Sequence, residues 1–179
     1  MNATRKQLTL ALIKPDVLLA SFPKQSLPSV QQSVASAFAN NRTHNSATPT
    51  RSGIENNPFR GIVDLIRRNG FEVLDWKTLQ LSIEDAERFY GEHEGRFFYQ
   101  RLVSFITSGP IVSLVLRKDN AIADWRTLMG PTHKQRALRE APTSIRALYA
   151  TSDTRNATHG SDSEESAARE INFFFGGKL

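Results

Sequence analysis

The sequence contains no cysteine among its 179 residues. Neither a disulfide framework nor a thiolate metal site can therefore form, and an intracellular setting is the simpler interpretation. Long hydrophobic runs are also missing, because no apolar stretch approaches the roughly 20 residues that a membrane-spanning helix needs. Residues 1–7 lack the apolar core of a secretory signal peptide. These absences predict a cytoplasmic protein that is not inserted in a membrane, and they leave a mitochondrial location open.

Acidic residues are outnumbered, because the chain has 23 lysines and arginines against 18 aspartates and glutamates, for a formal net charge of +5. This excess favours an anionic partner, either nucleotide or nucleic acid, and it also fits a solvated basic surface. Aromatic residues are not interleaved with a basic run as a stacking groove requires, which makes nucleic acid the weaker alternative. The length and the hydrophobic share of 39% fit one globular domain over residues 1–179.

One segment, at about residues 20–57, is short of large apolar side chains and rich in Ser, Asn, Gln, Thr and Pro. A segment of this composition does not bury enough apolar surface to offset the entropy of ordering it. The composition therefore predicts a mostly disordered insertion. Val30, Val34 and Phe38 nevertheless share one helical face, so a short helix over residues 28–40 is the alternative.

The rest of the chain alternates between strand and helix patterns. Residues 7–13 and 111–116 are almost wholly apolar, as is typical of strands buried on both faces, and residues 71–81 alternate as a further strand. Asn57 and Ser82 are suitable N-caps. We expect helices over 58–69, 82–90, 94–107 and 120–129, a short strand over 156–159 and a last helix that ends at Phe173 to Phe175. This order predicts an α+β sandwich with helices on one face of the sheet.

His159 stands directly before the start of the last helix. Ser161, Asp162 and Ser163 offer N-cap oxygens for that helix. Gly160, beside the histidine, lets the backbone turn sharply or a ligand approach closely. The pattern indicates a histidine at a defined position, although a His-Gly-Ser run taken alone is more often an ordinary loop.

Other segments agree with this run, and together they resemble the nucleoside diphosphate kinase family. Residues 156–163 read Asn-Ala-Thr-His-Gly-Ser-Asp-Ser, and the family signature is an asparagine, two residues, then His-Gly-Ser-Asp-Ser. Further family segments occur in family order, at residues 8–16, 109–110, 126–132 and 143–146. The resemblance covers residues 7–20 and 58–175, leaves the insertion uncovered, and is strongest to the divergent type 6 branch.

The resemblance implies a ferredoxin-like α+β sandwich, in which a four-stranded antiparallel sheet is covered by helices. It also implies transfer of the γ-phosphate of a nucleoside triphosphate to a nucleoside diphosphate, through a phosphohistidine in a ping-pong cycle. His159 is then the nucleophile, Glu170 and Ser161 orient it, and Tyr90 lies beside it. This chemistry fits the residue types, because phosphoryl transfer needs cations and one well-aimed nucleophile.

The nucleotide-binding residues are likewise implied by the resemblance. The implied contacts are Lys14 and Arg146 to the γ-phosphate, Arg126 and Thr132 to the β-phosphate, Asn156 to the ribose hydroxyls and Phe98 to the base. An arginine fork matches two phosphate oxygens, whereas a lysine acts as a point charge. The implied cofactor is Mg²⁺ carried by the nucleotide phosphates, with no protein ligand for the metal.

Two departures from the family pattern leave an alternative open. Asp153 stands where common members place a small apolar residue against the base, and a carboxylate there weakens stacking. The loop from Thr132 to Arg146 is longer than usual, and this loop builds trimer contacts in the family's hexamers, so we expect a homo-oligomer without relying on a hexamer. The alternative function is a nucleotide-binding or partner-dependent interaction module with little intrinsic kinase activity. Two other histidines, His93 and His133, match no catalytic position, and we expect them on the surface.

Overall fold

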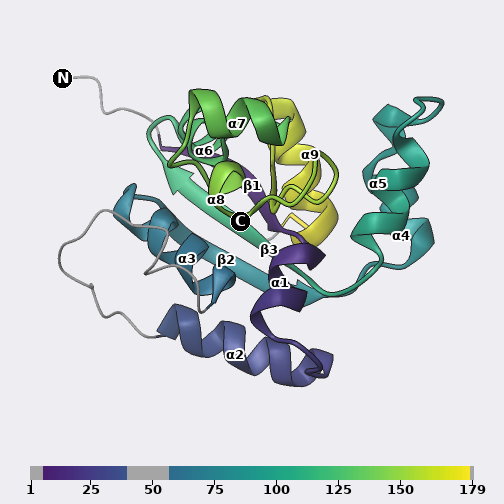
Figure 1. The fold of residues 1–179 in the computed structure, drawn as a ribbon, viewed down its shortest axis with the longest axis horizontal. Helices are drawn as coiled ribbons and strands as arrows, with labels where there is room; N and C mark the ends of the chain where they lie inside the picture. The colour runs from purple at the N-terminus through teal and green to yellow at the C-terminus, as the bar shows by residue number, and fades with distance from the viewer. Residues whose placement is uncertain (1–5, 40–56, 178–179) are drawn as a thin grey trace.

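The computed structural model describes residues 6–39 and 57–177, and its centre is a four-stranded sheet. The strands of this described part are β1 (Gln7–Ile13), β2 (Glu72–Leu79), β3 (Ile111–Lys118) and β4 (Thr158–Gly160). They lie in the order β2-β3-β1-β4, and every neighbouring pair is antiparallel (Figure 1). The expected four-stranded antiparallel sheet is therefore confirmed.

Helices make up most of the remaining described residues. They are α1 (Pro15–Ser21), α2 (Leu27–Ala39), α3 (Pro58–Arg68), α4 (Ile83–Phe89), α5 (Tyr99–Ile106), α6 (Ala121–Met129), α7 (Lys134–Glu140), α8 (Ile145–Tyr149), α9 (Glu164–Phe175) and the 3₁₀ turn η1 (Gly91–His93). Among the described helices, none has the length and apolar character needed to cross a membrane.

Strand β1 separates two hydrophobic cores. Ala11 and Ile13 point to one face and pack with residues of α1, α2, α3, α6 and α8. Leu10 and Leu12 point to the other face and pack with residues of α4, α5 and α9. All four side chains are fully buried, and the three large ones each contribute about 2 kcal/mol to folding. Helices therefore cover both faces, and the expectation of one covered face is wrong, because strands that are apolar on both sides need a cover on each.

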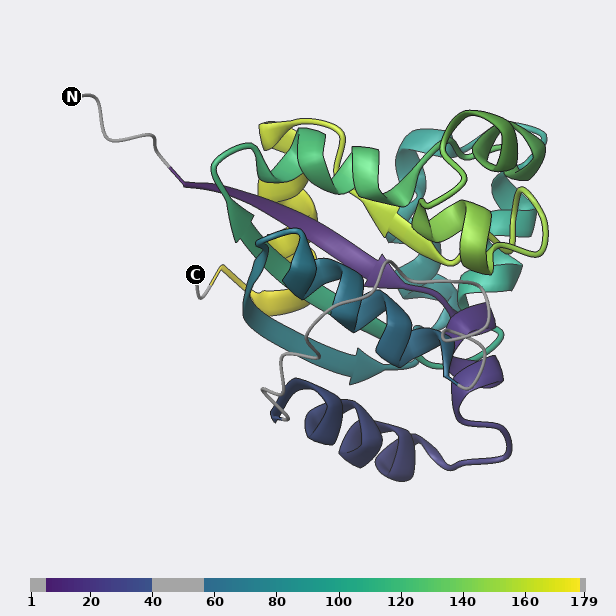
Figure 2. The same ribbon diagram turned by 60° about the vertical axis from the view of Figure 1, so that its left-hand side comes forward.

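The segment expected to be mostly disordered holds an ordered helix, so that prediction is wrong over residues 27–39. Val30 and Val34 of α2 are buried, and Phe38 stacks on Trp76 of β2 with ring centroids 5.4 Å apart. The Arg67 guanidinium donates hydrogen bonds to the Ala37 and Phe38 carbonyls at the end of α2, at 3.0 and 2.9 Å. Figure 2 shows α2 lying along β2 and α3. The few apolar side chains of α2 are buried against these elements, although the segment as a whole is polar. Residues 40–56 lie outside the described residues.

Capping residues in the sequence correctly predicted where two helices begin. The Asn57 side chain accepts a hydrogen bond from the Arg60 amide at the start of α3, and Ser82 accepts one from the Asp85 amide at the start of α4. The helix expected over 94–107 begins only at Tyr99, because Gly95 adopts a φ of +79° that no helix continues through. The long loop before Arg146 contains the short helix α7, which the sequence pattern did not predict.

The carboxyl end of β1 and strand β4 lie next to each other, and this pairing brings an early and a late segment of the chain together. Leu12 pairs with His159, and Ile13 pairs with Thr158. In Figure 1 the helices α4 and α5 stand apart from the other helices, beyond one end of the sheet. The site described next lies between these two helices and the β1–β4 pair.

Candidate active site

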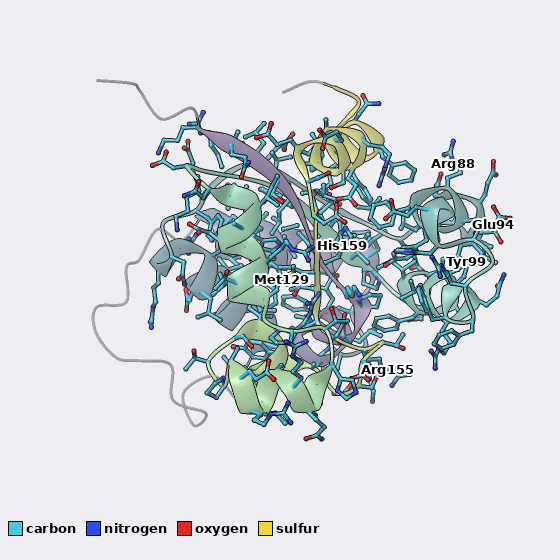
Figure 3. The ribbon with its side chains drawn as sticks, turned by 90° about the horizontal axis from the view of Figure 1, so that it is seen from above. Arg88, Glu94, Tyr99, Met129, Arg155 and His159 are labelled. Atoms are coloured by element: carbon cyan, nitrogen blue, oxygen red, sulfur yellow. The ribbon has the colours of Figure 1, made fainter. Side chains whose placement is uncertain are left out.

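A cavity of about 750 Å³ opens between the α4–α5 pair and the sheet. Figure 3 shows His159 and Met129 near the middle of the molecule, with α4 and α5 to one side. Nine of the residues that the sequence predicts for the active site line this cavity: Lys14, Tyr90, Phe98, Arg126, Thr132, Arg146, Asn156, His159 and Glu170. Ser161 lies behind them and contacts Glu170. Residues from six separate segments of the chain therefore meet at one cavity.

The imidazole of His159 is held by a buried carboxylate. Its Nε2 lies 3.0 Å from Glu170 Oε1, and the Ser161 hydroxyl donates to Glu170 Oε2 at 2.7 Å. The Leu10 amide of β1 donates in turn to Ser161 Oγ at 3.2 Å. A carboxylate at Nε2 favours the tautomer with a proton on that nitrogen, which leaves the Nδ1 lone pair free. The arrangement thus presents one unprotonated ring nitrogen on a side chain that is 23% exposed.

The backbone of His159 is fixed by its neighbours in β4 and α6. The Trp125 indole donates to the His159 carbonyl at 3.1 Å. A Cβ on Gly160 would lie only 2.3 Å from Trp125 Cδ1, so the indole fits there because residue 160 has no side chain. Gly160 therefore serves close packing against Trp125, a use that differs from the sharp turn and the ligand approach that its sequence pattern suggested.

A strained turn leads into β4. The Thr158 amide donates to the Asn156 carbonyl at 2.8 Å, and Ala157 between them has a φ of +68°, a rare γ-turn conformation. Two bonds from the other end of the chain hold this turn. The Ala157 amide donates to Asp16 Oδ2 at 2.9 Å, and the Lys14 amide donates to the Ala157 carbonyl at 2.9 Å. The Lys-Pro-Asp segment therefore shapes the backbone just before His159 as well as supplying a cation.

Lys14 and Arg146 are buried cations whose hydrogen bonds go to neutral acceptors. Lys14 Nζ donates to Asn156 Oδ1 at 2.7 Å, while Arg146 donates to the Gly130 and Thr158 carbonyls at 2.7 and 3.2 Å. Burial, with the nearby Arg146 charge, lowers the pKa of Lys14 to about 8. Burial, with the Arg126 charge, lowers the pKa of Arg146 to about 10. Neutral acceptors fix both side chains without cancelling their charge, which remains available to an anion.

Tyr90 forms the wall beside the imidazole. Its side chain is buried, and burial together with the Glu170 carboxylate raises the pKa of its phenol well above the usual range. Its neighbour Phe89 packs edge-on against the imidazole of His159, with ring centroids 5.3 Å apart. The tyrosine therefore stays neutral, and it can donate or accept a hydrogen bond at the cavity wall.

The far end of the cavity is lined by aromatic rings. Phe98 is partly buried and makes an edge contact with the His93 ring at 5.6 Å. Phe97 is 89% exposed and has the Arg101 guanidinium 5.6 Å above its ring. The chain therefore offers flat apolar surfaces to a planar ligand at this end, with little around them to hold its position.

Asp153 differs from its expected position over a base. Its carboxylate accepts a hydrogen bond from the Lys134 amide at 2.9 Å and lies 3.3 Å from His133 Nε2, so it is directed to the start of α7. The side chain is about half exposed and still lines the cavity. The lengthened loop, folded as α7, therefore supplies a partner for the carboxylate.

Sequence reasoning missed part of this lining. His93, which was expected on the surface, is partly exposed but also lines the cavity, with its ring stacked on Tyr90 and edge-on to Phe98. Its three-residue spacing from Tyr90 could have shown this, because residues so spaced share a face of a helical turn. His133 is exposed, as expected. Phe97 and Arg101 carried no sequence signal of a role at the site, and Asp16 was matched only as part of the family segment at residues 8–16.

Acidic side chains are scarce at the inner end of the cavity. Within the described part of the chain, no group of three or more His, Asp or Glu side chains could hold a metal ion. The donors here are cations and neutral groups, which fit phosphate oxygens and fit a bare divalent cation poorly.

Comparisons with known proteins agree with the motifs. A sequence model described as nucleoside diphosphate kinase matches residues 50–178. The mouse protein "Nucleoside diphosphate kinase 6" is 57% identical over 110 residues, which are 62% of this chain and 58% of that protein. A nucleoside diphosphate kinase of Flavobacterium psychrophilum is 46% identical over 141 residues, covering 79% of this chain and 98% of the other. The chain thus spans about three fifths of its mouse relative and nearly all of the bacterial one.

Solved structures give the same result for the fold. The nucleoside diphosphate kinase of Aquifex aeolicus matches with a TM-score of 0.71 and 33% identity, over 96% of each chain. A nucleoside diphosphate kinase from Encephalitozoon cuniculi matches with a TM-score of 0.68 at 22% identity, a level that supports the fold alone. The expected ferredoxin-like architecture is therefore confirmed.

Proposed function

Because the chain belongs to the nucleoside diphosphate kinase family, we propose that it moves the γ-phosphate of a nucleoside triphosphate to a nucleoside diphosphate through a phosphohistidine at His159. The observation that carries the proposal is the 3.0 Å contact of His159 Nε2 with Glu170, which leaves Nδ1 unprotonated at a cavity lined by cations. A neutral imidazole with one nitrogen held is the form in which histidine acts as a nucleophile.

The reaction proceeds in two balanced half-steps. Nδ1 of His159 attacks the γ-phosphorus, the bond from phosphorus to the bridging oxygen breaks, and the nucleoside diphosphate leaves with that oxygen. The phosphorylated ring gains positive charge, which the Glu170 carboxylate at Nε2 offsets. An incoming diphosphate then attacks the phosphohistidine with a terminal oxygen, the nitrogen–phosphorus bond breaks, and His159 returns to its neutral form.

The buried cations stabilise the transferring group. Lys14 and Arg146 bind the γ-phosphate, and Arg126 with Thr132 binds the β-phosphate. Hydrogen bonds to Asn156, Gly130 and Thr158 hold Lys14 and Arg146 in place before the nucleotide arrives, so little reorganisation is needed at the transition state. Tyr90 and Ser161 support the imidazole and its carboxylate.

The outer part of the cavity receives the nucleoside. Phe98 stacks on the base, and Asn156 contacts the ribose. Stacking accepts any base, because every base has a π face, so the substrates are ATP and other nucleoside tri- and diphosphates. Magnesium arrives on the nucleotide phosphates and adds charge neutralisation there. Homo-oligomer formation stays a prediction.

Labelling with γ-³²P-ATP tests the proposal. The phosphoprotein should be acid-labile and alkali-stable, as a phosphoramidate is, and His159→Asn should remove the label. His93→Asn is the matched control, because His93 lines the same cavity without a carboxylate within 3.5 Å to fix its tautomer. Equal labelling of wild type and His159→Asn would rule out the nucleophile assignment.

A second function is favoured by the position of Asp153. Its carboxylate lines the cavity and is about half exposed, and a charged group at this wall weakens apolar contact with a base. A protein with this wall could bind nucleotide and turn it over slowly, as a nucleotide-binding or partner-dependent interaction module. Steady-state transfer from ATP to a second nucleoside diphosphate separates the two, since tight ATP binding without transfer supports the module.

A further inference from the structure

His159 has one polar contact to its ring, and that contact does not fix the ring by itself. The bond between Nε2 and Glu170 Oε1 places one atom of the imidazole. Rotation about the Cβ–Cγ bond can still pivot the ring within the range that this hydrogen bond allows, and Nδ1 moves with the ring because it lies off that axis. Phosphoryl transfer requires the attacking nitrogen to lie in line with the leaving oxygen, so this pivot matters.

Phe89 supplies a second contact on the same ring. Its ring centroid lies 5.3 Å from that of the imidazole, and the two planes meet at 73°. This is an edge-to-face arrangement, which aromatic pairs prefer over a face-to-face stack. A ring placed across the imidazole in this way opposes the pivot that the single hydrogen bond leaves free.

Phe89 is itself held from several sides, so it forms a fixed surface. Its ring packs against those of Tyr90, Phe173 and Phe174, at 4.9, 5.7 and 5.3 Å. The side chain is 8% exposed at the end of α4, and two of its three aromatic neighbours belong to α9, the helix that carries Glu170. The Arg169–Glu92 ion pair at 2.7 Å ties α9 to the turn after α4.

We propose that Phe89 is a positioning residue for the phosphoryl transfer. It sets the plane of the His159 imidazole, while Glu170 sets its tautomer, and together they aim Nδ1 into the cavity. The inference rests on the proposed function, because it concerns the same nucleophile. An ordinary core role would give Phe89 the same burial, but it would not require contact with the nucleophile.

Phe174 offers a matched control within the same cluster. It is 7% exposed, packs against Phe89, and makes no ring contact with His159 in the described residues. Phe89→Leu and Phe174→Leu therefore remove the same ring from the same core and differ in contact with the imidazole. Both should lower the thermal midpoint by similar amounts, because similar apolar area is lost.

Kinetics separate the two variants. Phe89→Leu should lower the rate of His159 phosphorylation by ATP on the order of tenfold or more, with the nucleotide KM within about twofold of wild type. Phe174→Leu should keep the wild-type rate within about twofold. Equal loss in both variants, or no loss in Phe89→Leu, would overturn the inference. If Phe89→Leu fails to fold, Phe89→Met gives the same comparison with a flexible apolar side chain.

Imidazole NMR on the nucleotide-free protein tests the geometry without turnover. The wild-type protein should give one sharp set of His159 ring signals with a proton on Nε2, and nuclear Overhauser contacts to the Phe89 ring. In Phe89→Leu these signals should broaden, and in Phe174→Leu they should not. Absence of the Overhauser contacts in wild type would overturn the inference. A wild type that keeps these contacts but takes no phosphate would refute the proposed function instead.

Discussion

The side chains at the inner end of the cavity are buried and hydrogen-bonded, whereas those at its outer end lie largely in solvent. Lys14, Arg146 and Glu170 are at most 9% exposed, and each has hydrogen-bond partners at 3.2 Å or less. Phe97 is 89% exposed, and its neighbour Arg101 is exposed as well. Fixed charge therefore lies where bonds would change, and loosely held surface lies where a base would rest.

This difference has a physical basis. Transition-state stabilisation depends on groups that need not move when charge develops, and burial raises the strength of each charge. Base stacking depends on contact area and tolerates small displacements. The two ends should therefore respond differently to substitution, and the following changes compare them, beginning with the largest expected effect.

Arg146→Ala should damage the inner end most. The change removes a buried cation and leaves the Gly130 and Thr158 carbonyls without the donors they now have. We expect kcat/KM to fall on the order of a thousandfold, and the free energy of unfolding to fall by about 3 kcal/mol. Arg146→Lys is the control, because it keeps the charge and cannot reach both carbonyls. A kcat/KM within threefold of wild type in Arg146→Ala would contradict the role of fixed charge.

The lowered pKa of Lys14 predicts that nucleotide binding depends on pH. Its pKa of about 8 lies below the ordinary lysine value of 10.5, because burial and Arg146 oppose its charge. The folded protein therefore binds fewer protons than the unfolded chain between about pH 8 and 10.5, and Lys14 makes folding more favourable as pH rises through that window. Bound phosphate favours the charged form, so nucleotide affinity should weaken above pH 8, by up to about tenfold per pH unit.

Calorimetry at pH 8.5 with a non-hydrolysable ATP analogue, which carries the γ-phosphate that Lys14 is proposed to bind, measures the linked proton directly. Titration in two buffers of different ionisation enthalpy should show proton uptake by the wild-type complex. Lys14→Arg, which stays charged in this range, should remove most of the uptake. Equal uptake in both proteins would assign the proton to another group.

Val34→Ala on α2 separates stability from function, because α2 lies away from both ends of the cavity. Val34 is fully buried, so its truncation should cost about 2 kcal/mol of unfolding free energy. The transfer rate at 25 °C should stay within about twofold of wild type. Deletion of the whole helix should lower the thermal midpoint further, since it uncovers Phe59 and Trp76. Thermal unfolding and transfer assays on the same preparation decide between loss of stability and loss of function.

Phe98→Leu should have the smallest effect, because it changes the outer end alone. Loss of one stacking platform should raise the nucleotide KM a few-fold, or about 1 kcal/mol, with kcat nearly unchanged. The rise should be similar for ADP, GDP and CDP. A fall in kcat as large as that of Arg146→Ala would remove the distinction between the two ends.

Local signals in the sequence predicted the parts of the fold that depend on neighbouring residues. Asn57 and Ser82 were identified as caps, and both accept the expected backbone hydrogen bonds. Ser163 begins α9 with a capping box, four residues after His159. These features need no knowledge of the tertiary structure, because each cap bonds to an amide within three positions.

Features that depend on distant partners were predicted poorly. A helix over residues 28–40 was only the alternative for its segment, because α2 becomes ordered through Phe59, Arg67 and Trp76, which come later in the chain. Asp153 turns toward α7, a helix without a periodic apolar pattern in its residues. The contact of Phe89 with His159 joins residues 70 positions apart, and no local pattern encodes it. The family motif supplied the residues expected at the cavity, and physical pattern alone would have left most of them unassigned.

Nδ1 of His159 is the atom proposed to receive the phosphate, and the roles of Glu170 and Phe89 depend on this assignment. The direct measurement is the phosphohistidine isomer in the phosphoenzyme formed from ATP, obtained by NMR of protein with ¹⁵N-labelled histidine or by isomer-resolved analysis of an alkaline digest. Glu170 at Nε2 predicts phosphate on Nδ1 of His159 and on no other residue. Phosphate on Nε2, or on a residue other than His159, would contradict the account.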